Sequence, residues 1–176
     1  KAGGPSTSEM VLGKWLHANN LYGKLTVASK GCHPYKEDMN HSRINEKDMM
    51  LDISQSLDHL KTDCLDIWFF HRDNPLMGAD EIIDLASLLI DKKLVKHLGV
   101  SNWKTDRIEA ANIWAKEHGR APFEISEIQW SLAHCTPQTW GDDTLVCMTE
   151  EERTWYEKQN MPVMCFAPQA KGLFSK

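Results

Sequence analysis

The stretch Leu65-Asp66-Ile67-Trp68-Phe69-Phe70 is a short apolar run that ends directly before the chemically useful side chain of His71. Four other runs in the chain end in the same way. They are Leu25 to Ser29 before Lys30, His97 to Val100 before Ser101 and Asn102, Ile125 to Ile128 before Gln129, and Val163 to Cys165 before Phe166. The intervals between these end points are about 30 to 40 residues. Each is enough for a strand, a returning helix and two loops, because a βαβ unit takes roughly 30 residues or more.

Repeated alternation of strands and helices predicts a parallel sheet. In a closed (β/α)8 TIM barrel the active site is assembled at the carboxyl ends of successive strands, which is where these side chains fall. The five runs account for about five of the eight strands. We therefore expect an incomplete α/β barrel in which residues 1–176 form a single partial domain. About two strands would be missing before Lys1 and one after Lys176.

The segments between the runs carry helix signals. Ser6 and Glu9 form a capping box, and Thr149 and Glu152 form a second one. Thr105 is placed to cap another helix, and a further helix is expected to start at Asn45. The apolar side chains expected to face inward are Val11, Leu12, Trp15 and Leu16; Met49, Met50, Ile53, Leu57 and Leu60; Ile82, Ile83, Ala86, Leu89 and Ile90; and Ile108, Ala111 and Ala115, whereas Asp84, Ser87, Asp91 and Lys92 are expected to face water.

The composition argues against two classes of protein. The 176 residues have a formal net charge of −5 and a pI near 5.9, and we find no basic face of the kind that nucleic-acid binding needs. The longest near-apolar stretch, Cys64 to Phe70, is far shorter than the ~20 residues that cross a bilayer, and no signal peptide opens the chain. We therefore expect neither a nucleic-acid partner nor a membrane association.

The five cysteines are spread along the chain and form no CxxC pair, which favours reduced thiols in a cytoplasmic protein over a disulfide framework. Two of them adjoin histidines, in Cys32-His33 and His134-Cys135, and this raises zinc binding as an alternative. Adjacent residues make awkward joint ligands, and the usual zinc-site spacings are missing. We therefore expect no metal site.

Six motifs follow one another along almost the whole chain. They are Ser8-Glu9 through Leu12-Gly13-Lys14-Trp15-Leu16, Ala28-Ser29-Lys30-Gly31, Asp66 to Asp73, Gly99-Val100-Ser101-Asn102-Trp103, Gln129-Trp130-Ser131-Leu132, and Phe166-Ala167-Pro168-Gln169-Ala170-Lys171-Gly172. In this order they resemble the successive motifs of the aldo-keto reductases. The resemblance implies an oxidoreductase that transfers hydride between NADPH and a carbonyl or alcohol substrate, with NADH left open as the cofactor.

The resemblance implies catalytic roles for two residues. Lys30 matches the lysine whose ammonium lies beside a catalytic tyrosine, and His71 matches the histidine that hydrogen-bonds the substrate carbonyl oxygen. A positive charge about 4 Å from a tyrosine is worth on the order of 4 kcal/mol at an effective dielectric of 20. It would bring an ordinary tyrosine pKa of about 10 within range of proton donation.

The resemblance also implies a cofactor site. Ser101, Asn102 and Gln129 match the residues that hydrogen-bond the nicotinamide carboxamide. Phe166 lies where an aromatic ring, often a tyrosine, stacks on the nicotinamide, and phenylalanine keeps that stacking surface.

Two members of the family's catalytic set have no counterpart in this chain. The tyrosine and the aspartate belong to the segment before Ser8-Glu9, where the chain has only Lys1-Ala2-Gly3-Gly4-Pro5. Tyr22 and Tyr35 fall in a turn and a loop, and neither is a credible substitute. We therefore expect the longer parent protein to be an enzyme and these 176 residues alone not to turn over.

Three tryptophans fall near expected strand ends or in the long loop over residues 133–148. Trp103, Trp130 and Trp140 are therefore expected to wall a substrate pocket that favours an apolar or aromatic carbonyl compound.

Other interpretations stay open at this stage. Taken one at a time, Lys30 is a solvated lysine, His71 a structural histidine, Ser101-Asn102 a turn and Phe166 a core residue. A cofactor-binding regulatory protein on the same scaffold, as in the potassium-channel β subunits, is the main alternative to an enzyme. A hydrolase or isomerase barrel is a weaker one, because Ser101 has no evident base partner. Besides its small-molecule substrate, the protein is expected to have at most copies of itself as partners.

Overall fold

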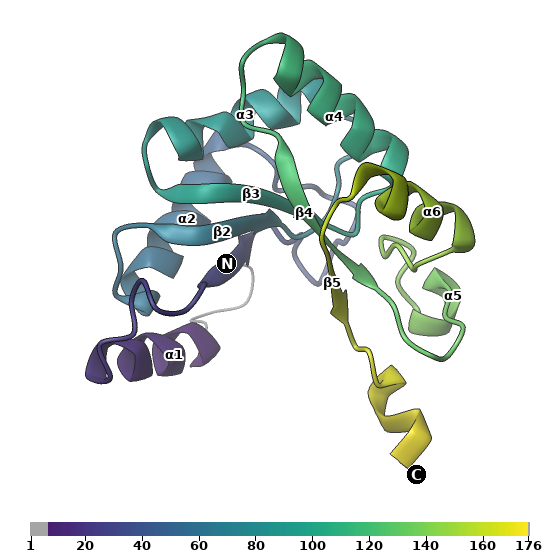
Figure 1. The fold of residues 1–176 in the computed structure, drawn as a ribbon, viewed down its shortest axis with the longest axis horizontal. Helices are drawn as coiled ribbons and strands as arrows, with labels where there is room; N and C mark the ends of the chain where they lie inside the picture. The colour runs from purple at the N-terminus through teal and green to yellow at the C-terminus, as the bar shows by residue number, and fades with distance from the viewer. Residues whose placement is uncertain (1–6, 176) are drawn as a thin grey trace.

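The computed structural model describes residues 7–175 and places five strands in one parallel sheet. The strands are β1 (Ala28–Gly31), β2 (Leu65–Phe70), β3 (Val95–Ser101), β4 (Phe123–Gln129) and β5 (Val163–Phe166), and they lie side by side in chain order. The sheet curls into a half-barrel with helices packed on its outer side (Figure 1). The expected incomplete (β/α)8 barrel with about five strands is confirmed.

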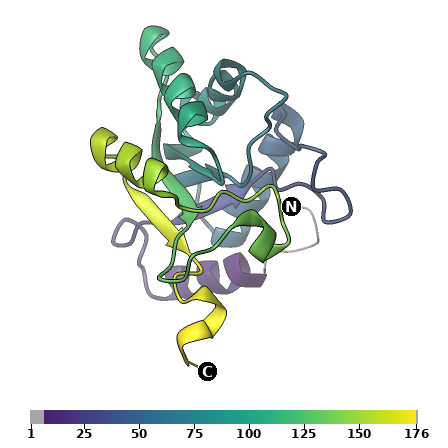
Figure 2. The same cartoon turned by 90° about the vertical axis from the view of Figure 1, so that its right-hand side faces the viewer.

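Helices alternate with the strands along the chain. They are α1 (Thr7–Ala18), α2 (Glu46–Leu60), α3 (Ala79–Asp91), α4 (Thr105–Glu117), the single turn α5 (Pro137–Trp140), α6 (Glu150–Gln159) and the 3₁₀ segment η1 (Ala170–Ser175). Helix α1 lies near the β1 edge of the sheet, and η1 projects away from the β5 edge (Figures 1 and 2).

The two faces of the sheet have different contents. Trp68 and Phe70 of β2 are buried in the core under the helices. Phe69, between them, points to the concave inner face, where a Cβ added to Gly99 would lie 2.6 Å from its ring. Lys30 of β1 shares this face, with its Nζ 5.4 Å from the centroid of the Phe69 ring. Glycine at position 99 therefore leaves room for an aromatic floor beneath Lys30.

Helix α1 packs with a different face from the one expected. Leu16 is buried as expected, but Val11 is 66%, Leu12 38% and Trp15 49% exposed, while Glu9 and Gly13 are buried instead. A Cβ on Gly13 would collide with the backbone of α2 at His59 and Leu60, so glycine permits a close helix contact there. Hydrogen bonds from the Ser29 and Ser56 hydroxyls to the Glu9 carboxylate fix the same face against β1 and α2. Polar bonding and close backbone approach thus decide the packing that apolar spacing alone mispredicts.

The expected helix caps are only partly right. The side chain of Thr149 accepts from the Glu152 N–H at the start of α6, as expected. The helix expected to start at Asn45 begins one residue later, at Glu46, and the Asn45 side chain caps it by accepting from the Asp48 N–H. The Thr105 cap is wrong, because α4 starts at Thr105 itself after Lys104, which makes no side-chain cap bond. The capping box that begins at Ser6 lies outside the described residues.

Ser87 of α3 also differs from its expected exposure to water. It is 3% exposed, and its hydroxyl donates to the Ile83 carbonyl one turn earlier, at 2.9 Å. A serine that bonds back to its own helix needs no water and can face a core.

The loop that follows β1 is tied to α2 by a buried ion pair. The Arg43 guanidinium donates to both carboxylate oxygens of Asp52 at 3.0 Å, and the backbone N–H of Cys32 donates to the same carboxylate at 2.8 Å. The two charged side chains are 2% and 1% exposed. Burial by itself raises the pKa of Asp52, but hydrogen bonding, with the bond from Arg43 the largest contribution, outweighs burial and holds that pKa below its usual value.

Candidate active site

Strands β1 and β2 bring Lys30 and His71 to one end of the sheet. Lys30 is the third residue of β1, His71 follows β2 directly, and the His71 backbone N–H donates to the Gly31 carbonyl at 3.0 Å. Both residues line the same open hollow, which we call the Lys30–His71 hollow, together with His33, Lys36 and six neighbours. The residues that match a catalytic pair are therefore together at the carboxyl ends of their strands.

The ring of His33 supports the ring of His71. The two imidazoles meet edge to face with 4.5 Å between their centroids, and Nδ1 of His33 lies 2.6 Å from the Pro34 carbonyl oxygen. Burial lowers the pKa of His33, although the hydrogen bond to Pro34 opposes this shift. The lowered pKa favours the neutral imidazole, whose Nδ1–H donates to the Pro34 carbonyl. His33 orients His71 without adding a positive charge to the hollow.

Lys30 has an acidic partner on the far side of the half-barrel. Its Nζ lies 2.8 Å from Oε2 of Glu127 in β4, so the ion pair spans the concave face above β2 and β3. Sequence reasoning missed Glu127. The signal was present, because Glu127 lies two residues before Gln129 in the same strand and so shares its face.

Ser101 and Asn102 belong to a closed hydrogen-bond network. The Asn102 amide donates to the Ser101 hydroxyl oxygen at 3.0 Å and to the His71 carbonyl at 3.3 Å, and its oxygen accepts from the Val146 N–H at 3.3 Å. Asn102 has a φ of 59°, a left-handed conformation that asparagine tolerates better than most residues. Its side chain therefore links the ends of β2 and β3 to the loop after β4 and holds the Ser101 hydroxyl in place.

Gln129, at the end of β4, is 2% exposed. Its backbone exchanges hydrogen bonds with the long loop, accepting from Met148 N at 2.8 Å and donating to the Val146 carbonyl at 3.3 Å. Its side-chain nitrogen donates to the Ser131 hydroxyl at 3.3 Å, and its side-chain oxygen has no hydrogen bond to any residue in the described range 7–175. This oxygen is thus an acceptor with unused capacity.

Phe166 forms an aromatic corner with the long loop over residues 133–148. Its ring lies 6.2 Å from that of Trp140, edge to face, and Nζ of Lys171 lies 4.1 Å above the Trp140 ring. Trp140 belongs to the one-turn helix α5 inside the loop. Trp130, just beyond β4, is 41% exposed. These three aromatic residues are at or near the surface beyond β4 and β5.

Trp103 does not wall a pocket, contrary to the sequence expectation. It is fully buried, its ring lies 5.3 Å from that of Phe123, and the Arg107 guanidinium lies 5.5 Å from its centroid. The chain turns at the left-handed Asn102 and enters α4, which leaves the large indole in the core, where its burial stabilises the fold.

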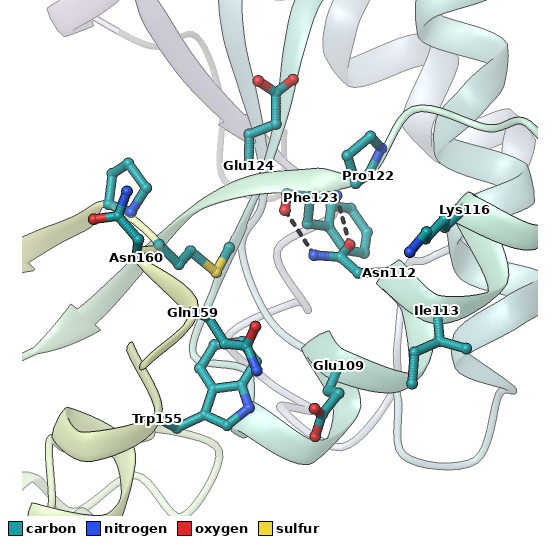
Figure 3. A pocket seen from close by; sticks show the side chains of 12 residues that line it. Glu109, Asn112, Ile113, Lys116, Pro122, Phe123, Glu124, Trp155, Gln159 and Asn160 are labelled. Atoms are coloured by element: carbon teal, nitrogen blue, oxygen red, sulfur yellow. Dashed lines mark hydrogen bonds between the residues drawn. The ribbon is translucent and has the colours of Figure 1, made fainter. Parts of the chain in front are cut away.

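A separate hollow lies between α4 and α6 (Figure 3). Phe123 and Pro162 line it at the start of β4 and β5, and Asn112 reaches across to bond the Phe123 backbone at 2.8 and 2.9 Å. Parallel strands all begin at the same end of a sheet. This hollow is at the amino ends of the strands, whereas Lys30 and His71 are at the carboxyl ends. It is therefore not part of the candidate active site.

Three further findings concern the chain as a whole. Among residues 7–175, no group of three histidine, cysteine, aspartate or glutamate side chains is arranged to hold a metal ion. In the same range no helix is both long and apolar enough to cross a membrane. All five cysteines are free thiols.

The known proteins that are similar to this chain are aldo-keto reductases and aryl-alcohol dehydrogenases. Residues 4–176 match the aldo/keto reductase family. A putative aryl-alcohol dehydrogenase of Saccharomyces cerevisiae is 26% identical over 132 residues, which cover 71% of this chain and 35% of the relative. An aryl-alcohol dehydrogenase [NADP(+)] of Phanerodontia chrysosporium is 27% identical over 135 residues, which cover 72% of this chain and 35% of the relative. The aldo-keto reductase ausK of Emericella nidulans is 24% identical over 131 residues, which cover 70% of this chain and 33% of the relative.

The chain spans about a third of the length of these curated relatives. The family match covers nearly all of it, and the half-barrel agrees with that match. The chain therefore belongs to the aldo/keto reductase family, whose oxidoreductases generally use NAD(P)H and act on carbonyl substrates.

Proposed function

We propose that these residues form the cofactor-binding and carbonyl-orienting part of an NADP(H)-dependent oxidoreductase that interconverts an aryl aldehyde and its alcohol. The main support is that Lys30 and His71 line one hollow in a chain of this family. The names of the Saccharomyces and Phanerodontia relatives, both aryl-alcohol dehydrogenases, support the aryl substrate, and the name of the second supports NADP. Exposed Trp130 is compatible with an aromatic substrate.

The residues present fit a nicotinamide ring. Phe166 has a half-buried ring at the end of β5, suited to stacking. The Ser101 hydroxyl donates to no residue within 7–175, and the Gln129 side-chain oxygen accepts from none, so together they match the acceptor and donor of a carboxamide. When bound, the cofactor supplies or accepts the hydride.

The chain's own residues would orient and polarise the carbonyl. His71, steadied by the neutral ring of His33, would hydrogen-bond the carbonyl oxygen and fix its position for reaction. Lys30 would place a positive charge beside the proton-donating group and make proton release easier.

The proton donor itself does not come from a tyrosine of this chain. Of its three tyrosines, Tyr22 donates to the Leu60 carbonyl at 2.8 Å, and Tyr35 is 47% exposed on the loop after β1. The Tyr156 hydroxyl bonds Ser126 at 2.8 Å behind β4, and burial raises its pKa to about 12. We therefore propose that the 176-residue chain by itself binds cofactor and does not turn over.

This proposal can be tested with the purified chain. NADPH is titrated while its fluorescence is recorded, and an aromatic aldehyde is then added while NADPH oxidation is followed. We expect saturable binding that is weakened by Phe166→Ala, and no oxidation. A matched control is Phe123→Leu, because Phe123 is at the amino end of β4 and Phe166 is at the carboxyl end of β5. Lack of saturable binding would contradict the cofactor site, and steady oxidation would contradict the absence of a proton donor.

A cofactor-binding regulatory protein is the second candidate. It would use the same cofactor contacts, and the presence of both Lys30 and His71 in one hollow favours the enzyme over it. An activity assay distinguishes the two candidates when residues 4–176 are part of a closed barrel. An enzyme then reduces aldehydes, and a regulatory protein binds NADPH without doing so.

We further propose a cytoplasmic location, which the five free thiols support, and self-association in isolation. Exposed apolar side chains at both ends of the half-barrel support self-association, among them Trp15 and Phe174.

A further inference from the structure

Glu127 is the acidic residue that meets Lys30 on the concave face. The side chains are 27% exposed for Lys30 and 11% for Glu127, so the pair is largely sheltered from water. Phe69 lies beneath the ammonium at 5.4 Å from ring centroid to Nζ. Lys30 is therefore held between a carboxylate and an aromatic face, both of which favour a cation.

The two acids that line the Lys30–His71 hollow, Glu9 and Asp52, are engaged on the helix side of the sheet. Glu9 accepts from the Ser29 and Ser56 hydroxyls, and Asp52 accepts from Arg43 and the Cys32 N–H. Within residues 7–175, Glu127 is the carboxylate that pairs with Lys30.

The backbone of Glu127 is fixed at the cofactor side of the candidate site. Glu127 is opposite Ser101 in the β3–β4 register, and its carbonyl accepts from the Asn102 N–H at 3.1 Å. The carboxylate thus extends from the strand position next to the Ser101 hydroxyl. A lysine has a long, flexible side chain, and an active-site group must be held within about 0.5 Å of its working position. A fixed carboxylate meets that need.

We propose that Glu127 is a positioning residue that holds the ammonium of Lys30, which lines the Lys30–His71 hollow, above Phe69. The inference rests on the proposed function, because it assigns Glu127 a part in preparing Lys30 for carbonyl chemistry. Without Glu127 the ammonium loses its charged hydrogen-bond acceptor and moves toward solvent.

The first test measures the Lys30 ammonium directly. The full chain is labelled with ¹⁵N at lysine Nζ, the Lys30 signal is identified by its loss in Lys30→Arg, and the exchange of its protons with water is measured by NMR. We expect Glu127→Gln to speed this exchange at least about tenfold, because a charge-assisted hydrogen bond is lost. Glu124→Gln is the control, since Glu124 is on the same strand and pairs with exposed His97. Equal exchange in the wild type and Glu127→Gln would overturn the inference.

A double variant covers the case in which Glu127→Gln does not fold. In Lys30→Gln with Glu127→Gln neither member of the pair is charged, so no unpaired charge remains on the concave face. We expect this double variant to unfold at a higher temperature than either single variant. Purely additive losses would contradict a direct pairing.

The second test links the pair to the cofactor. Trinitrobenzenesulfonate modifies accessible lysines, and the fraction of Lys30 modified is read by mass spectrometry of the peptides. We expect NADPH to protect Lys30 in the wild type, and Glu127→Gln to increase its modification several-fold without cofactor. If NADPH gives no protection but Glu127→Gln still exposes Lys30, the proposed function fails and the pairing stands. If NADPH protects and Glu127→Gln changes nothing, the role of Glu127 is overturned.

Discussion

The loop behind β1 and the concave face in front of it each depend on an ion pair, and the two pairs are built differently. Arg43 and Asp52 make two hydrogen bonds and are almost fully buried, whereas Lys30 and Glu127 make one contact and remain partly exposed. A planar guanidinium suits permanent bidentate bonding, and an ammonium on a flexible stem suits a point charge that can serve a ligand. The comparison teaches that burial and bonding geometry distinguish a charge that stabilises the fold from one that can interact with a ligand.

The largest expected effect breaks the structural pair. Arg43→Met should lower the free energy of unfolding by about 3 to 5 kcal/mol, because it removes the guanidinium that pairs with the buried Asp52 carboxylate. Denaturant titration followed by circular dichroism measures this loss. Arg153→Met is the control, since Arg153 makes its ion pairs on the surface of α6, and it should have no measurable effect. Equal stability of the two variants would remove the distinction between the pairs.

The next effect concerns the available charge. In a closed barrel that includes residues 4–176, Lys30→Met should reduce aldehyde turnover at least about 100-fold, the usual scale of acid–base assistance, with little change in NADPH affinity. Steady-state kinetics gives both quantities. Lys96→Met, which removes an exposed lysine bound to Asp66, is the control. Near-normal turnover in Lys30→Met would place Lys30 with Arg43 among purely structural charges.

A smaller effect is expected at the network that supports Ser101. Asn102→Ala should weaken NADP binding by about 1 to 3 kcal/mol, because the His71 carbonyl and the Val146 N–H lose a partner and the Ser101 hydroxyl loses its support. Fluorescence titration measures the affinity. Asn112→Ala removes a comparable amide at the amino end of β4 and should cost stability while leaving cofactor affinity unchanged. Unchanged affinity in Asn102→Ala would mean that Asn102 only shapes the turn.

The smallest expected effect is on how the stability of the protein depends on pH. Because the pKa of Asp52 is held below its usual value, its pairing contributes stability above the unfolded-state pKa of about 3.9. This contribution is lost as the pH falls through the lower folded-state pKa. The wild type should therefore lose more stability below about pH 4 than Arg43→Met does. Parallel acid-unfolding curves for the two proteins would show that Asp52 titrates independently of Arg43.

The sequence predicts the half-barrel well because each strand is a short apolar run followed by a polar or aromatic residue. β2 begins and ends where its run predicts, and β1 begins three residues later than expected. Apolar spacing fails for α1, where a glycine contact and the bonds of a buried glutamate decide which face packs. Such contacts join residues far apart in the chain, so spacing along one helix cannot reveal them.

The candidate site was predictable to a similar extent. Lys30 and His71 could be placed at the ends of neighbouring strands because register and strand order follow from a parallel sheet. Glu127 was missed because its partner is three strands away, and only the curvature of the sheet brings the two together. Trp103 was misplaced for the opposite reason, since its nearness to the site in sequence concealed a turn into the core.

The order of the strands in the sheet has a consequence for how the chain folds during synthesis. Because β1 to β5 pair in the order in which they leave the ribosome, each new strand and helix can dock on an edge that already exists. No strand has to wait for a distant partner, so every addition closes a loop of modest length. The sheet can therefore form one strand at a time, and the unpaired edge of β5 can pair with a further strand.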